Sequence, residues 1–276
     1  MPSLRKHAPR TNGLLATLPR KEYERLFPSL EEIPLLYEKV LYEPGGLILD
    51  VYFPTSGIVS LLAAVEDRAT LEVGLVGREG MVGLPVFMDV KTSRNRAVVQ
   101  GAGYAFRMKA KVFQKECDSD GSLPRLLRRY THSLLTQISQ SAVCNRFHPI
   151  DARLARWLLM TRDRMGADEF QLTQEFLSNM LGVRREGVNK AAGELQQRNL
   201  IRYSRGALTI LNRPGLEAIA CKCYRIIKEE YDAFLPQLAR GKTLHSSQLS
   251  DPVQQLRVTG SLAASRRKNR RGEDRR

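Results

Sequence analysis

Long hydrophobic runs are the first thing that the sequence lacks. No apolar stretch in its 276 residues approaches the about eighteen consecutive apolar residues that a membrane-spanning helix needs. Residues 1–20 are basic, but they contain no apolar core and no small-residue cleavage site, so a secretory signal peptide is not expected. We therefore expect a cytoplasmic protein without a membrane partner.

Cysteine is also scarce. The four cysteines are Cys117, Cys144, Cys221 and Cys223, and their spacing matches neither a disulfide framework nor the paired pattern of a zinc site. Cys221 and Cys223 form the one close pair, and the surrounding sequence predicts a helix, in which residues two apart point to different faces. We predict unpaired thiols and no metal site, with a redox role for the pair as the alternative.

Acidic residues are too few to balance the basic ones. The chain has 44 lysines and arginines against 29 aspartates and glutamates, which gives a formal net charge of +15 and a pI of about 10.0. Such a charge indicates a polyanionic partner, either nucleic acid or an anionic membrane surface, and the first is favoured here. The chain ends in SRRKNRRGEDRR, and we predict a disordered basic tail over 241–276.

The predicted secondary structure changes along the chain. After a predicted disordered lead over 1–13, residues 14–36 show short helical patterns that prolines interrupt. Between residues 40 and 111, short strand-like runs alternate with glycine-rich and polar turns, which is typical of a sandwich, barrel or jelly roll. The runs are VLYE, LILDVYF, IVSLLAAV, TLEVGLV, AVVQ and YAFRM. We predict a β-rich sensor domain over 14–121.

A long helix is predicted over 122–147. Its apolar residues recur at alternating four- and three-residue steps, like the seam of a coiled coil. This stripe could pack on the helix's own domain or on a second subunit. Because it is long, and small and polar in its second half, we predict a dimer interface. The predicted interface residues are Leu123, Leu127, Tyr130, Leu134 and Ile138.

A hinge is predicted directly after this helix. Pro149 disfavours helical backbone at His148, and a further helix then begins with Asp151 as its expected N-cap. We assign residues 148–240 to a second domain.

The strongest functional signal lies in residues 172–210. Thr173 is a good N-cap for a short helix that ends at Leu181, and Gly182 supplies a left-handed turn. A second helix follows over 184–197, with small residues on its buried side. A helix, a glycine turn and a second helix define a helix-turn-helix.

Charged and polar residues gather on the exposed face of this second helix. Arginine can form two hydrogen bonds to guanine, and glutamate can accept one from cytosine, so we predict that this face reads DNA bases. A solvated charged face is the alternative, but it does not explain the glycine turn or the β-hairpin wing predicted over 200–210. The predicted base-reading residues are Arg184, Arg185, Glu186, Asn189 and Lys190. The predicted phosphate contacts are Thr173, Gln174, Arg202 and Arg205.

Over residues 14–235 the chain resembles the Crp/Fnr family of bacterial transcription regulators, chiefly through LGVRREGVNKAAGELQQRNLI. The resemblance implies an α+β fold with an N-terminal β-roll sensor domain, a long dimerisation helix and a C-terminal winged helix-turn-helix. It further implies a homodimer that binds a palindromic double-stranded DNA site, with half-sites related to TGTGA, and that contacts RNA polymerase. Arg185, Glu186 and Lys190 match the family's three base-reading positions. Lys190 lacks the bidentate geometry of arginine, so readout there should be less strict.

The same resemblance assigns an effector pocket to residues 80–100. Met81 stands where members that bind cyclic nucleotides carry the ribose-binding carboxylate, and Ala97 lacks the hydroxyl that follows the phosphate arginine, here Arg96. A shifted register would offer Ser93 and Arg94 instead. We predict no response to cyclic AMP. The residues at the pocket positions are Gly80, Met81, Gly83, Leu84, Arg96 and Ala97.

The turn VGREGMVGLPVF, residues 76–87, raises a related question. Its glycines suit a phosphate cradle, but the missing polar groups favour a retained structural turn, with Arg78 and Glu79 as a salt pair exposed to water. No cofactor is identified. The resemblance also covers an iron–sulfur branch, but that cluster requires N-terminal cysteines, and the chain has none before Cys117. A haem stays open.

Three classes of function were compared. The favoured one is a sequence-specific DNA-binding transcription regulator. The alternative is a small-molecule sensor, of cyclic nucleotide, haem or redox type, that acts mainly through protein contacts. An enzyme is not expected, because the sequence contains no Walker loop, GxSxG or HExxH motif.

Overall fold

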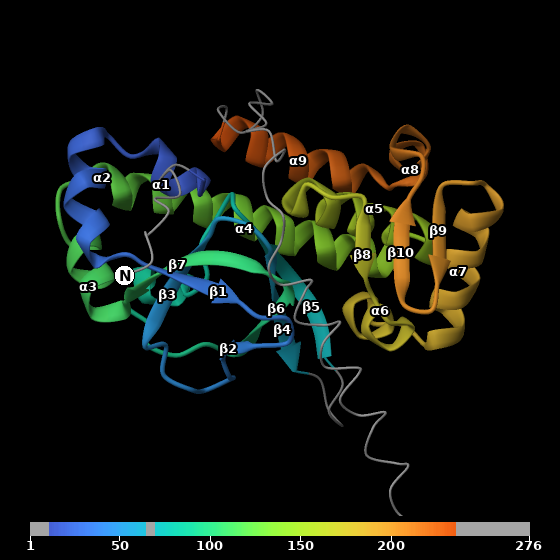
Figure 1. Ribbon diagram of the computed structural model, residues 1–276, viewed down its shortest axis with the longest axis horizontal. Helices are drawn as coiled ribbons and strands as arrows, with labels where there is room; N and C mark the ends of the chain where they lie inside the picture. Colours follow the sequence, from blue (N-terminus) through green and yellow to red (C-terminus); the bar gives the residue numbers. More distant parts are fainter. Residues whose placement is uncertain (1–10, 65–69, 236–276) are drawn as a thin grey trace, which may run out of the picture. The chain divides into compact units, whose positions relative to one another are not determined.

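The structure is a computed structural model that describes residues 11–64 and 70–235 (Figure 1). The predicted basic tail and most of the predicted disordered lead lie outside these residues. Asn12, at the end of that lead, is fully buried and caps α1 (Gly13–Thr17). Its side-chain amide donates hydrogen bonds to the carbonyl oxygens of Pro54 and Gly80, each at 2.8 Å. The start of the described chain is therefore tied to the glycine-rich turn.

Residues 14–36 are helical only in their first part. After α2 (Arg20–Leu26) and the 3₁₀ helix η1 (Phe27–Ser29), the chain forms strand β1 (Glu31–Leu35) where short helical patterns were predicted. Pro34 cannot donate a ladder hydrogen bond, but β1 pairs only with β7 and is an edge strand, where proline is tolerated.

Two antiparallel sheets make up the predicted β-rich domain, and both lie beside α4 in Figure 1. One has the order β1-β7-β3, and the other has the order β2-β6-β4-β5. The remaining strands are β2 (Val40–Tyr42), β3 (Asp50–Pro54), β4 (Ile58–Ala64), β5 (Thr70–Val76), β6 (Asn95–Gly101) and β7 (Gly103–Lys109). Each of the six predicted strand-like runs corresponds to one of them.

Helices continue the chain after β7. The sequence analysis did not predict α3 (Ala110–Cys117), but α4 (Ser122–Phe147) has the predicted bounds. The helix ends before His148 and Pro149, as predicted for the hinge, and α5 (Ile150–Met165) follows. Asp151 lies in the first turn of α5 rather than at its N-cap, which is Pro149.

The apolar stripe of α4 faces its own chain. Leu123, Leu127, Tyr130 and Leu134 are all buried within the protomer, and Ile138 is half-buried. They leave no surface for a second subunit, so the prediction of an interface at the first four positions was wrong. The stripe packs instead against β5 and α9 (Lys222–Phe234). On the opposite side of α4, Leu135, Val143 and Phe147 are exposed at 56%, 42% and 71%.

The C-terminal part combines a three-stranded sheet with four further helices. The sheet has the order β8-β10-β9, formed by β8 (Glu169–Gln171), β9 (Ile201–Ser204) and β10 (Ala207–Ile210). The helices are α6 (Gln174–Leu181), α7 (Arg185–Gln197), α8 (Arg213–Ile219) and α9. The predicted α+β class and its order, a β-rich region followed by a long helix and a helix-turn-helix, are confirmed. No helix in the described residues is long and apolar enough to cross a membrane.

Candidate DNA-binding site

The helix-turn-helix is formed by α6 and α7. Thr173 caps α6 by accepting a hydrogen bond from the backbone N–H of Phe176 at 3.0 Å. Gly182 ends α6 in the left-handed conformation, with φ of 60°. A Cβ at Gly182 would also lie 2.7 Å from Cδ1 of Leu71 on β5. Both the left-handed backbone and the close contact therefore favour glycine at this turn.

The charged and polar side chains at the start of α7 are exposed. Arg184 is the N-cap, Arg185 begins the helix, and the buried face on the opposite side is small and apolar. All five predicted base-reading residues are exposed, and none of them forms an ion pair within the described part of the chain. Those five residues are Arg184, Arg185, Glu186, Asn189 and Lys190. The structure therefore groups them on one exposed face at the first turns of α7.

The predicted wing is the hairpin of β9 and β10. Arg202 is exposed on β9, and Arg205 lies at the hairpin tip. Arg205 and Gly206 both have positive φ, 51° and 83°, as in the two-residue turns that usually contain asparagine and glycine. A left-handed arginine costs about 1–2 kcal/mol relative to a favoured conformation. The strand β8, which the sequence analysis missed, completes the wing sheet.

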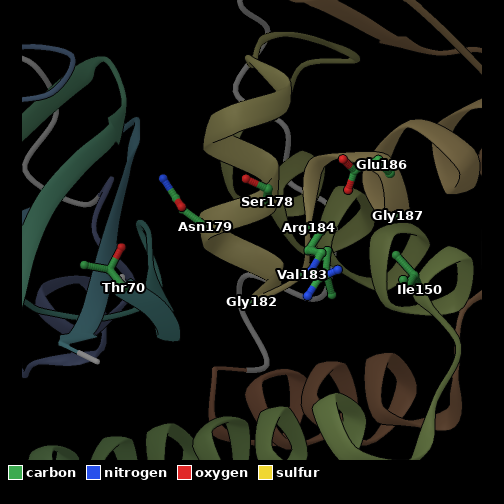
Figure 2. A pocket seen from close by; sticks show the side chains of 9 residues that line it. All are labelled: Thr70, Ile150, Ser178, Asn179, Gly182, Val183, Arg184, Glu186 and Gly187. Atoms are coloured by element: carbon green, nitrogen blue, oxygen red, sulfur yellow. The ribbon is translucent and has the colours of Figure 1, made fainter. Parts of the chain in front are cut away.

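A shallow hollow of about 640 Å³ lies between β5 and the helix-turn-helix (Figure 2). Asn179 of α6 and Thr70 of β5 lie on its two sides, and the turn after α6 forms one wall. The lining residues are Thr70, Ile150, Ser178, Asn179, Gly182, Val183, Arg184, Glu186 and Gly187. The start of α7 thus borders the sheet that contains β5, a proximity that no local sequence pattern indicates.

Comparison with known proteins identifies the segment that contains the helix-turn-helix. Residues 152–219 match the model of the Crp-like helix-turn-helix domain. They form a Crp-like helix-turn-helix domain. No curated relative matches the sequence.

Solved structures of Crp/Fnr regulators share the wider fold. FixK2 from Bradyrhizobium japonicum has a TM-score of 0.60 at 17% identity, over 70% of this chain and 98% of its own. The c-di-GMP responsive regulator CLP from Xanthomonas campestris has a TM-score of 0.58 at 17% identity, over 70% and 100%. A CRP/FNR-family transcriptional regulator from Thermus thermophilus gives 0.57 at 22%, over 69% and 98%. At these identities the likeness concerns the fold.

An ion pair joins the Crp-like domain to the glycine-rich turn. Glu79 was predicted to lie at an exposed turn tip with Arg78, but it is buried and its carboxylate accepts a hydrogen bond from Nε of Arg164 in α5 at 2.7 Å. The same guanidinium donates to Oε1 of Gln137 in α4 at 3.0 Å and lies 5.4 Å from the ring centre of Tyr231 in α9. Arg78 alone is exposed, so the predicted salt pair was wrong.

A second polar contact crosses between β5 and α5. Glu72 accepts hydrogen bonds from the hydroxyl of Ser60 at 2.7 Å and from Nε1 of Trp157 at 2.9 Å. Burial of the carboxyl raises the pKa of Glu72 to about 7, although both hydrogen bonds act in the opposite direction. Since the folded-state pKa is raised, the folded protein favours the protonated form. The contribution of this carboxyl to stability therefore weakens as the pH rises towards 7.

Most residues at the predicted effector-pocket positions are buried. Met81, Leu84 and Ala97 are buried, while the side chain of Arg96 is partly exposed and pairs with Glu43 at 3.2 Å. A Cβ at Gly80 would lie 2.4 Å from the hydroxyl oxygen of Tyr130.

Tyr42 occupies the space beside these positions. It is buried and is the cross-strand partner of Ala97. Burial raises the pKa of Tyr42 to about 12. A buried phenol ring is therefore the neighbour of Ala97 across this strand pair.

All four cysteines are free thiols, as predicted, but three of them lie close together. Cys221 is the N-cap of α9 rather than a residue within a helix, so it can lie on the same side as Cys223. Their thiols and that of Cys144 lie beside His148, and the four potential ligand atoms are all within 4.8 Å of one another. The sequence analysis missed this cluster because 77 residues separate Cys144 from Cys221.

Proposed function

We propose that the protein is a sequence-specific DNA-binding transcription regulator of the Crp/Fnr type, not an enzyme. The observation that carries this proposal is the exposed set of basic and polar residues on α7, within a Crp-like helix-turn-helix domain; none of them forms an ion pair with another described residue. Lys190 and the arginines would pair with base edges in the major groove, and Glu186 would accept from cytosine.

The surrounding groups suit the phosphate backbone. Arg202 and Arg205 project from the wing, and the hydroxyl of Thr173 can donate to a phosphate while it caps α6. Gln174, at the first position of α6, completes the proposed phosphate contacts. The net charge of +15 adds a sequence-independent attraction to DNA.

Replacing Arg185 with alanine tests base reading. We expect the change to weaken binding to the preferred site by about 1–3 kcal/mol and to relax the preference at one base pair. The preferred site would first be selected from random duplexes, and affinity would then be measured by fluorescence anisotropy on that site and on unrelated duplexes.

Arg225→Ala is the matched control for lost charge. Arg225 is exposed on α9, outside the helix-turn-helix, and pairs only loosely with Glu229 at 3.6 Å. It should leave the site preference unchanged. Equal losses on specific and unrelated DNA for Arg185→Ala would contradict the base-reading role, and an absence of any preferred site would contradict the proposed function.

We further propose that a second copy of the chain covers the exposed face of α4. Leu135, Val143 and Phe147 are large apolar side chains left in water, with the half-buried Ile138 at the edge of this face. Pairing two α4 helices would bring two recognition helices to one palindromic site, as the geometry of dimeric helix-turn-helix proteins requires.

Leu135→Asp should disrupt this pairing. We expect the variant to sediment as a monomer at concentrations where the parent protein is a dimer, because a carboxylate would be buried at the centre of the interface. Val112→Asp, at an exposed valine on α3, serves as the control. A monomeric parent protein, or an unaffected dimer in the Leu135 variant, would contradict the assignment.

We also propose that cyclic AMP is not an effector. Buried Tyr42 lies opposite Ala97, and neither Met81 nor Ala97 offers a polar group. Isothermal titration with cyclic AMP should give no binding heat and no change in DNA affinity. Saturable micromolar binding would overturn this reading. Contact with RNA polymerase and a cytoplasmic location complete the proposal.

A further inference from the structure

Three thiols and one imidazole meet where α4, the hinge and α9 adjoin. Cys144 lies in the last turn of α4, His148 is in the hinge, and Cys221 and Cys223 begin α9. Cys144 and Cys223 are buried, whereas His148 and Cys221 are half-buried. We propose that these four residues form a site for one thiophilic, tetrahedrally coordinated metal ion, with zinc as its expected occupant.

The spacing of the ligand atoms fits such an ion. Sγ of Cys144 lies 3.4 Å from Sγ of Cys221, and Sγ of Cys223 lies 3.6 Å from Nδ1 of His148. Around a tetrahedral zinc ion, with bonds of ~2.3 Å to sulfur and ~2.0 Å to nitrogen, two sulfur atoms are ~3.8 Å apart and a sulfur–nitrogen pair is ~3.5 Å apart. The four atoms therefore need only small shifts to enclose one ion.

The charges around the cluster favour thiolates. Arg153 and Arg156 of α5 are both buried, and neither is within ion-pair distance of a carboxylate in the described residues. Arg156 donates to the uncharged Oγ of Ser141 and Sδ of Met160, and its Nε has no hydrogen-bond partner. Three thiolates and one zinc ion would carry a net charge of −1, which these buried guanidinium groups can offset.

The position of Cys221 in the fold also favours a thiolate. This thiol is at the N-terminus of a 13-residue helix, where the helix dipole favours an anion. The Sγ atom of Cys144 lies 3.4 Å from it, so a cation between the two sulfur atoms would interact with both.

A closed set of four protein ligands indicates a structural ion. Such sites leave no open position for substrate, and their binding energy stabilises the fold. Here the ion would fasten the start of α9 to the end of α4 across the hinge, next to the Crp-like domain. The site is independent of the proposed function, because metal content does not depend on DNA binding.

Metal content of the full chain tests the proposal. Protein produced with zinc, kept reduced and freed of excess metal should contain one zinc per chain by elemental analysis. Cys221→Ser with Cys223→Ser should lose it, whereas Cys117→Ser, at the cysteine outside the cluster, should retain it. Arg156→Gln should weaken zinc binding on the order of tenfold in a chelator competition while leaving the ligands in place.

Cobalt titration of the parent protein gives a readout that does not depend on variant folding. We expect one equivalent of cobalt(II) to produce the visible bands of a tetrahedral site together with thiolate-to-cobalt charge-transfer absorption, and zinc to abolish both. Binding without thiolate bands, or equal zinc in the double cysteine variant, would overturn the proposal. The proposal would also be overturned if the purified chain contained a Cys144–Cys221 disulfide and took up no metal after that disulfide was reduced. The cluster would then be a redox pair.

Discussion

Replacing Arg164 with methionine should lower the free energy of unfolding by about 3–5 kcal/mol, because the carboxylate of Glu79 would remain buried without its counter-charge. Gln137 would lose a donor at the same time. Urea unfolding followed by the fluorescence of Trp157, the single tryptophan and a buried one, measures the change.

Two further variants separate charge from packing. Glu79→Met together with Arg164→Met removes both charges and should recover much of the loss, because no buried ion is left unpaired. Arg20→Met breaks an ion pair with Glu24 that is exposed on the protein surface and should cost less than about 1 kcal/mol. A loss below that value for Arg164→Met would show that the buried pair is not important to stability.

Gly80→Ala should be nearly as damaging. The new Cβ would lie 2.4–2.5 Å from ring and hydroxyl atoms of Tyr130, and that ring is fully buried and held by a 3.0 Å hydrogen bond to the carbonyl oxygen of Met81. Overpacking of this kind costs about 1–3 kcal/mol and occasionally more, since neither the turn nor the ring can move freely. Thermal unfolding monitored by circular dichroism is the measurement.

Gly193→Ala is the matched control. Gly193 lies within α7, and a Cβ there would have no neighbour within 4 Å, so alanine should stabilise the protein by up to about 1 kcal/mol. Combining Gly80→Ala with Tyr130→Leu should restore part of the lost stability by removing the ring. If Gly80→Ala proves as harmless as Gly193→Ala, then Tyr130 does not fix this turn.

Local patterns predicted the helix-turn-helix in detail. Thr173, Gly182 and the small residues of α7 have roles set by neighbours a few positions away in the chain, and the structure places each as expected. The apolar stripe of α4 was located equally well, but its partner was not. A seven-residue period shows which side of a helix is buried without showing what buries it, and here β5 and α9 of the same chain do so.

Contacts between residues that are far apart in the chain could not be predicted from local sequence patterns. The pairing of Glu79 with Arg164 spans 85 residues, and the cysteine cluster forms only because α9 packs along α4. No spacing rule connects such positions in a single sequence. The exposed tip predicted for Glu79 and the scattered thiols were both reasonable local interpretations that tertiary packing overrode.

The hydrophobic core is continuous between the parts of the chain. One cluster of buried residues extends from Leu14, before the first sheet, to Leu235, after α9, and it includes residues of both β-sheets, α4, α5 and the wing. Regions that share a core lose stability together when it opens, so unfolding of the described chain should be cooperative rather than stepwise. For the same reason, the N-terminal β-sheets and the helix-turn-helix should not move independently. Any change in their relative orientation must break and remake shared contacts. We therefore expect two discrete relative orientations rather than a continuous range.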